Sequence, residues 1–254
     1  EAKRIAFADR NAFIADPNSV PQTVLSTLLS KNYAALRRKE INLDYRADSY
    51  KPANLSDQSA AAEGRQDLSG RDLGDTIYMT AADGDGNVIS LIQSLFGNFG
   101  SGVVAGDTGI VLQNRGSLFS LKKEHPNLLA PHKRPFHTLV PAMVFSNNRP
   151  WLSFGVMGGD MQPQGHVQVL LNLIDFGMNI QEAGEAARIR HSPLGVLLES
   201  AITAEARWGL QQRGHRLRNS IGAFGGFQGI LIDPTTGVLM GGSDPRKDGL
   251  AIGF

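Results

Sequence analysis

Residues 74–96 read GDTIYMTAADGDGNVISLIQSLF. Two β-prone runs, TIYMTAAD and VISLIQSLF, lie on either side of the turn residues GDGN. Apolar and β-branched runs separated by glycine-rich turn residues are typical of a β-hairpin. We therefore predict a hairpin whose first strand begins at Thr76.

The residues before this hairpin have a different composition. Residues 43–74, LDYRADSYKPANLSDQSAAAEGRQDLSGRDLG, are polar and have almost no apolar periodicity. Such a segment lacks the apolar residues needed to join a core, and we expect an exposed, mobile linker. The chain is thus predicted to consist of a segment 1–75 that ends in the linker and a unit 76–254.

Periodicity predicts the remaining elements. Apolar residues recur at helical spacing in residues 1–15 and 20–41, and Pro21 falls in the opening turn of the second helix. Further helices are expected over residues 164–176 and 180–190, and short strands over 109–114, 138–145, 151–159, 225–234 and 237–243. Strands and helices occur in blocks and do not alternate, which predicts an α+β fold of packed antiparallel sheets covered by helices.

Composition excludes several classes of protein. The net charge is +1, which points neither to nucleic acid nor to an acidic membrane surface. No apolar run approaches the roughly 18 residues of a membrane span. The chain has no Cys, so disulfides, a Cys nucleophile and thiolate metal sites are excluded, while cytoplasm and periplasm fit equally well. The chain starts at Glu1 in mid-pattern, and we expect part of the protein upstream to be missing.

Thr76 is a candidate nucleophile because of its place after the linker. If the Asp75–Thr76 peptide bond were cut, Thr76 would carry a free α-amine beside its hydroxyl. An α-amine has a pKa of about 8, so near neutral pH part of it is unprotonated and can accept the hydroxyl proton. One residue would then supply both nucleophile and base. The alternative is that Thr76 is simply a strand-forming residue.

Several separated motifs resemble one enzyme family. FGSGVVAGDTGIVLQNRGSLFS, APHKRPFHTLVPAMV, FGVMGGDMQPQGHVQ and GGSDPRKDGLAIGF are similar to the small subunit of γ-glutamyltransferases and their acylase relatives. The opening EAKRIAFADRN is similar to a helix late in the large subunit of that family. The motifs occur in the family's order and cover nearly the whole chain apart from the linker.

The resemblance has implications for fold and maturation. It implies an N-terminal-nucleophile hydrolase fold, an αββα sandwich of two antiparallel sheets between helical layers, incomplete in this chain. It also implies a precursor that cleaves itself between Asp75 and Thr76, with the remainder of the large subunit as a partner. An Arg that holds the substrate carboxylate in true transpeptidases would lie in the missing portion.

The same alignment implies roles for three further residues. Ser94 falls where the family has a Thr whose hydroxyl bonds the nucleophile, and a Ser retains that ability. Gly158 and Gly159 fall on the glycine pair whose N–H groups form the oxyanion hole, where the lack of a Cβ permits close approach. The alternatives are a polar residue on the outer face of a strand for Ser94 and an ordinary turn for the glycines.

The substrate pocket departs from the transpeptidase pattern. Arg115 and Leu118 correspond to the residues that grip the α-amino group of the glutamyl substrate, and Phe96 corresponds to an Asn that reads the same group. His137 and Thr138 replace a Ser-Ser pair that meets the substrate carboxylate. A guanidinium repels an ammonium but matches a carboxylate, so Arg115 would favour an acidic group. A surface or structural salt bridge is the other interpretation of Arg115.

We therefore predict a self-processing amidohydrolase or acylase that acts on a small acidic amide or acyl group through Thr76. A conventional glutathione hydrolase and transpeptidase, or a non-catalytic truncated relative, are the alternatives. No cofactor is expected, and no metal, because the spacing of His132, His137 and His166 matches no compact ligand motif. Residues 83–87, DGDGN, fit a hairpin turn better than a calcium loop. Assembly into a homo-oligomer of heterodimers is a further alternative.

Overall fold

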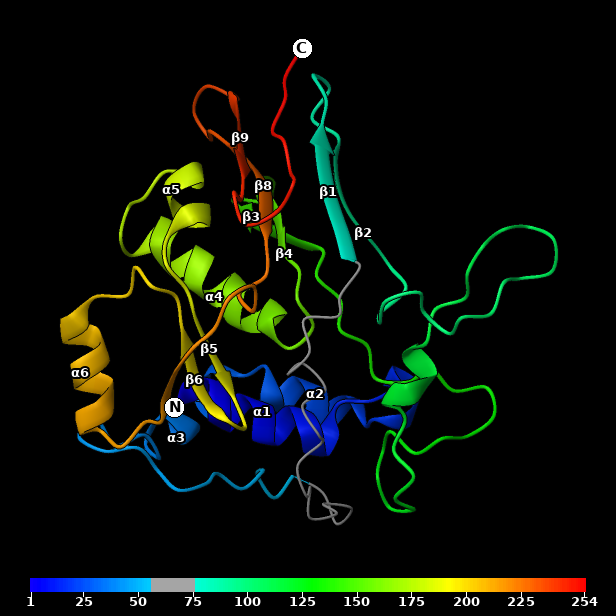
Figure 1. The fold of residues 1–254 in the computed structure, drawn as a ribbon, viewed down its shortest axis with the longest axis vertical. Helices are drawn as coiled ribbons and strands as arrows, with labels where there is room; N and C mark the ends of the chain where they lie inside the picture. The colour runs from blue at the N-terminus through cyan, green and yellow to red at the C-terminus, as the bar shows by residue number, and fades with distance from the viewer. Residues whose placement is uncertain (56–75) are drawn as a thin grey trace.

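The structure, a computed structural model, describes residues 1–55 and 76–254. Its helices are α1 (Ala2–Phe13), η1 (Pro17–Ser19), α2 (Gln22–Leu28), α3 (Lys31–Arg38), η3 (Arg115–Leu118), α4 (Met161–Ile174), α5 (Ile180–Glu185) and α6 (Ala204–Gln212). Its strands are β1 (Thr76–Ala82), β2 (Val88–Ser94), β3 (Ala142–Ser146), β4 (Arg149–Val156), β5 (Ile189–Ser192), β6 (Gly195–Leu198), β7 (Leu217–Asn219), β8 (Phe227–Ile232) and β9 (Leu239–Ser243). The fold is α+β, as predicted (Figure 1).

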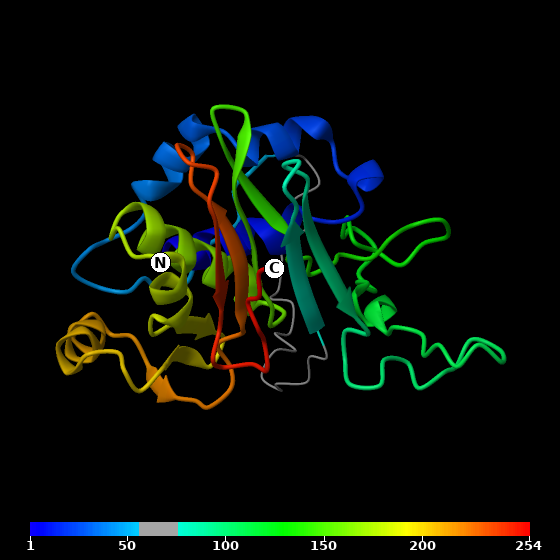
Figure 2. The same ribbon diagram turned by 90° about the horizontal axis from the view of Figure 1, so that it is seen from above.

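A four-stranded antiparallel sheet in the order β3-β4-β8-β9 forms the centre of the molecule. From Leu152 to Val156, strand β4 is buried on both faces, because its side chains alternate between two layers. Leu152, Phe154 and Val156 point to one side and pack against α4, α5 and β8. On the other side lies the predicted hairpin of β1 and β2, and Figure 2 shows the hairpin and the α4–α5 layer on opposite sides of the sheet.

Side-chain contacts fix the hairpin on this sheet. Thr80 Oγ1 lies 2.7 Å from Ser153 Oγ, and Tyr78 packs with Met157 and Val140. The Tyr78 ring lies so close over Gly155 that a Cβ there would come within 2.7 Å of it. The inner face of the hairpin is therefore bound tightly to β4. Its outer face exposes a set of apolar side chains: Ile77, Met79, Ile89 and Leu91.

The other elements lie around this centre. Helix α1 packs Ala12 and Phe13 against Val20 and Val24, the latter in α2. A separate three-stranded sheet, β5-β6-β7, contains one antiparallel and one parallel pair. The parallel pair β6–β7 departs from the expected all-antiparallel arrangement. No helix among residues 1–55 and 76–254 is long and apolar enough to cross a bilayer.

Several element predictions are corrected. Residues 20–41 form two helices, because Ser30 breaks the run and caps α3 by accepting the N–H of Tyr33. The helix expected to reach Arg190 ends at Glu185, since Ala186 adopts an extended ψ of 140°. Residues 109–114 are not a strand and contribute only an isolated bridge at Val111. Residues 43–55 contain no helix or strand, and the rest of the predicted linker lies outside the described residues.

Candidate active site

Thr76 is the first residue of β1 and lies directly opposite Ser94, the last residue of β2. The antiparallel register places both side chains on the inner, half-buried face of the hairpin. Thr76 Oγ1 donates a hydrogen bond of 3.0 Å to Ser94 Oγ, which also accepts the N–H of Phe96 at 2.9 Å. Ser94 is thus oriented by the backbone beyond the hairpin and in turn orients the Thr76 hydroxyl. Asp75, the other half of the expected cleavage site, lies outside the described residues.

Gly158 and Gly159 connect the end of β4 to the start of α4. Their φ angles of 120° and 57° are in the region that side chains other than glycine rarely adopt. The carbonyls of the pair accept the N–H groups of Met161 and Gln162 and so begin the helix. Within the described part of the chain, the N–H groups of Gly158 and Gly159 have no hydrogen-bond partner. Two unused donors near the positive end of a helix form a suitable site for a negative oxygen.

The packing of β1 on β4 brings Thr76 toward this pair. Thr80 lies against Ser153, and Tyr78 lies over Gly155. Since side chains on one face of a strand recur every second residue, the same step places Thr76 level with Met157, next to Gly158. The two halves of the predicted site therefore lie at the same end of the molecule.

Three of the five predicted pocket residues, Phe96, Arg115 and Thr138, are in contact with one another through Arg115. Phe96 has a φ of 76°, and its ring lies 5.0 Å from the guanidinium carbon of Arg115. Arg115 Nη1 donates to Thr138 Oγ1 at 3.3 Å, so residues of three separate segments meet here. Leu118 is buried on the same 3-10 turn as Arg115. His137 is half-buried beside Thr138, with Nδ1 2.6 Å from the carbonyl oxygen of Pro135.

Arg115 is a buried charge. Only 7% of the residue is exposed, and burial lowers the pKa of its guanidinium. A guanidinium nevertheless stays protonated near neutral pH. No Asp or Glu of residues 1–55 and 76–254 forms an ion pair with it. A buried cation lacking a counter-ion is costly, and an anionic ligand would relieve that cost.

The histidines considered as metal ligands do not converge. His166 lies on α4, accepts the N–H of Val156 at Nε2 (3.1 Å) and packs 4.7 Å from the Phe154 ring. Burial lowers the pKa of His166 to about 4, so it is neutral near pH 7. In the described ranges there is no group of three or more His, Cys, Asp or Glu side chains able to hold a metal ion.

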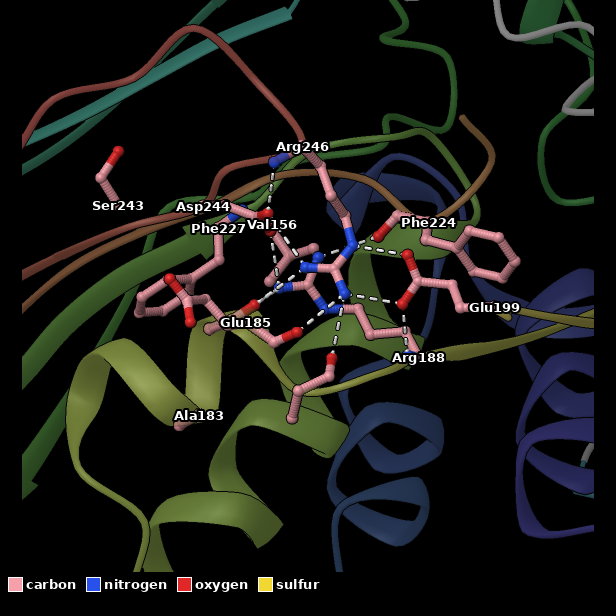
Figure 3. Close-up of polar contacts among 12 residues, drawn as sticks. Val156, Ala183, Glu185, Arg188, Glu199, Phe224, Phe227, Ser243, Asp244 and Arg246 are labelled. Atoms are coloured by element: carbon pink, nitrogen blue, oxygen red, sulfur yellow. Dashed lines mark hydrogen bonds and ion pairs between the residues drawn. The ribbon is translucent and has the colours of Figure 1, made fainter. Parts of the chain in front are cut away.

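A buried ionic cluster behind the glycine pair was not found by sequence reasoning. It consists of Arg188, Glu199, Asp244 and Arg246, and we call it the Arg188 cluster (Figure 3). Arg188 Nη2 lies 2.8 Å from Asp244 Oδ2, and both side chains are almost fully buried. Arg246 Nη1 contacts Asp244 Oδ1 at 2.9 Å. Its Nε and Nη2 atoms form a bidentate pair with Glu199. The sequence signal was the motif GGSDPRKDG, which contains Asp244 and Arg246 but neither Arg188 nor Glu199.

Comparison with known proteins gives a consistent result. The family model described as gamma-glutamyltranspeptidase matches residues 1–254. The chain is 39% identical to the glutathione hydrolase-like YwrD proenzyme of Bacillus subtilis and 35% identical to the oxamate amidohydrolase proenzyme of Klebsiella pneumoniae. Each alignment covers 100% of this chain and 46% of the relative, so the chain spans about half the length of these curated relatives.

Solved structures extend this similarity to the fold. The crystal structure of cephalosporin acylase from Bacillus halodurans superposes with a TM-score of 0.82 at 41% identity, over 97% of this chain and 42% of that one. The Helicobacter pylori gamma-glutamyltranspeptidase T380A mutant gives a TM-score of 0.61 at 29% identity, over 67% of this chain and 99% of that one. The N-terminal-nucleophile hydrolase fold that the sequence motifs imply is confirmed. The chain belongs to the gamma-glutamyltranspeptidase family.

Proposed function

We propose that this chain is the C-terminal catalytic part of a self-processing amidohydrolase or acylase. The observation that carries the proposal is the hydrogen bond from Thr76 Oγ1 to Ser94 Oγ at the first residue of β1. Cleavage of the bond between Asp75 and Thr76 would free the α-amine beside this oriented hydroxyl. The remainder of the large subunit, from the same precursor, is the expected partner, and relatives named proenzymes support this view.

In the proposed reaction, Thr76 acts twice. Its Oγ1 attacks the carbonyl carbon of an amide, while its α-amine takes the hydroxyl proton and passes it to the leaving amine. The N–H groups of Gly158 and Gly159 stabilise the oxyanion of the tetrahedral intermediate. Water then attacks the acyl-Thr76 ester, the same amine accepts a proton from that water and returns it to the leaving Thr76 Oγ1, and the acid is released.

The proposed substrate is a small acidic amide or acyl group. The acyl pocket would be lined by Phe96, Arg115, Leu118, His137 and Thr138. The guanidinium of Arg115 is buried and forms no ion pair with a carboxylate of the described residues. A carboxylate on the acyl group would therefore be its natural partner. Two similar proteins are named an oxamate amidohydrolase and a cephalosporin acylase, and these names support an amide or acyl substrate.

A glutathione hydrolase is the second candidate. Curated relatives with this name include the Escherichia coli proenzyme, which is 30% identical to this chain. This function requires an α-ammonium in the pocket that contains Arg115, which is electrostatically unfavourable. A γ-glutamyl anilide assay separates the two enzymes, and the absence of both self-cleavage and turnover would leave a non-catalytic relative.

The test of the proposal is maturation. Expressed in the precursor that contains this chain, the wild-type sequence should yield a fragment whose mass and N-terminal sequence start at Thr76. Thr76→Ala should leave the precursor uncut and unable to hydrolyse acyl anilides. Thr80→Ala is the matched control, because Thr80 lies on the same inner face of β1 but bonds Ser153 instead of Ser94. If Thr76→Ala is still cut before residue 76 and still turns over substrate, the proposal is wrong.

A further inference from the structure

The turn Ala223–Phe227 lies directly against the glycine pair. Met157 donates its N–H to the carbonyl oxygen of Gly226 at 3.1 Å. The backbone of Gly225 is so close that a Cβ there would lie 2.2 Å from the carbonyl oxygen of Met157. A Cβ on Gly158 would lie 3.3 Å from Gly225 Cα. The position of the turn therefore determines where Met157 and Gly158 can lie.

Buried charged side chains hold this turn at both ends. Arg188 Nη1 donates to the carbonyl oxygen of Phe224, and Arg190 Nη1 donates to that of Ala223, each at 3.0 Å. At the other end, Asp244 Oδ2 accepts the N–H of Phe227 at 2.9 Å. Arg188 and Asp244 also contact each other, so the two ends are linked through one ion pair (Figure 3).

The strength of these contacts follows from their burial. Arg188, Arg190 and Asp244 are 1%, 3% and 1% exposed. Hydrogen bonds to charged groups are stronger than neutral ones, and in a dry environment their geometry is well defined. A backbone turn with glycines at positions 225 and 226 is otherwise free to adopt many conformations. The charged side chains restrict that freedom.

We infer that Arg188, Arg190 and Asp244 are positioning residues that hold the Ala223–Phe227 turn against Met157 and thereby aim the N–H groups of Gly158 and Gly159. The inference rests on the proposed function for its catalytic meaning, since it assigns these N–H groups to the oxyanion. Stabilising donors must lie within hydrogen-bond distance of the developing charge, and small displacements reduce the rate strongly. The effect should therefore fall on kcat, with KM little changed.

The first experiment replaces Arg190 with Met, which keeps the length and apolar stem but removes the donors. Hydrogen exchange at the Met157 amide, bonded to Gly226, should become faster by about tenfold. With an acyl anilide, kcat should fall about tenfold while KM stays within about twofold. Arg190→Lys, which retains the charge and one donor group, should recover part of both effects.

Arg37→Met is the matched control. Arg37 is also buried and also donates to a backbone carbonyl, that of Lys51 at 2.9 Å, but it lies on α3. Arg37→Met should lower the stability of the fold without changing hydrogen exchange at the Met157 amide or kcat. If Arg37→Met reduces kcat as much as Arg190→Met does, the effect is a general loss of stability and the inference is overturned.

A second pair of variants covers the case in which Arg190→Met does not fold. Gly225→Ala places a methyl group on the Met157 carbonyl, whereas Gly237→Ala meets nothing within 4 Å, and the two glycines have similar φ angles of 71° and 76°. Only Gly225→Ala should accelerate exchange at Met157 and reduce kcat. Unchanged exchange at Met157 in Gly225→Ala and Arg190→Lys would overturn the inference. A wild-type protein without any acyl anilide turnover would instead contradict the proposed function. The exchange data would still decide whether the turn supports Gly158 and Gly159.

Discussion

At the scale of single residues, Arg115 is the side chain whose environment says most about the substrate. Its guanidinium is buried, lies over the Phe96 ring and bonds Thr138 through only one of its nitrogens. An ammonium placed about 4 Å from it would be repelled by about 4 kcal/mol at an effective dielectric of about 20. That corresponds to roughly a thousandfold in affinity.

The first prediction concerns this charge. The enzyme should show a higher kcat/KM for glutaryl or oxalyl amides than for γ-glutamyl amides with the same leaving group. Arg115→Gln should reduce kcat/KM for the acidic substrate by about tenfold or more and leave a neutral analogue nearly unchanged. The kcat/KM of Arg115→Lys for the acidic substrate should lie between those of the wild-type protein and Arg115→Gln, because Lys keeps the charge without the planar fork. A clear preference of the wild-type protein for the γ-glutamyl amide would show that Arg115 does not face the acyl group.

At the scale of elements, short helices depend on their caps. Helix α5 has a capping box, in which the Asn179 side chain accepts the N–H of Glu182 and the Glu182 side chain accepts that of Asn179. This helix also contributes Ile180 and Ala183 to the core beside β8. Loss of the cap should therefore loosen the packing of the whole helical layer on the sheet.

The second prediction tests this cap. Asn179→Ala should lower the free energy of unfolding by about 1 kcal/mol, measured by urea denaturation. Thr203→Ala removes a similar cap from α6, which buries no residue, and its effect on global unfolding should be smaller. Equal losses in the two variants would contradict the link between the α5 cap and the core.

The elements also show what sequence reasoning can and cannot find. The hairpin is predictable because its turn residues and strand propensities are local, and its register then brings Thr76 opposite Ser94. Strand β5 is not predictable, because its backbone is bonded by side chains from a distant helix. Gln164 and Gln168 of α4 accept the N–H groups of His191 and Ile189 in place of a neighbouring strand. The residues that support the glycine pair could not be predicted for the same reason, since Arg188 and Asp244 meet only in the folded chain.

At the scale of the whole molecule, stability should depend on the protonation of buried histidine. His166 has its pKa lowered from 6.5 to about 4 because burial disfavours its charged form. The unfolded chain therefore binds a proton at higher pH than the folded chain does. The stabilisation is fully present above pH 6.5 and is lost as the pH falls toward 4.

The third prediction follows from this difference. Between pH 7 and pH 5 the free energy of unfolding should fall by about 2 kcal/mol through His166 alone. His166→Gln, whose side-chain oxygen can still accept the N–H of Val156, should remove about that much of the pH dependence. The check is urea denaturation of both proteins at the two pH values. Identical slopes against pH would mean that His166 does not control this dependence.

The Arg188 cluster has a consequence for the order in which the site forms during synthesis and folding. The Thr76–Ser94 pair belongs to one hairpin, and hairpins of this kind close within microseconds once both strands exist. The inferred support of Gly158 needs Asp244, which is made much later and must meet Arg188 across the intervening residues 189–243. Under the proposed mechanism, the nucleophile is thus oriented early, whereas the oxyanion donors are fixed only after β9 has docked. An incompletely synthesised chain would therefore hold an oriented Thr76 hydroxyl without the donors that the proposed amide hydrolysis needs, so turnover would begin only once Asp244 has reached Arg188.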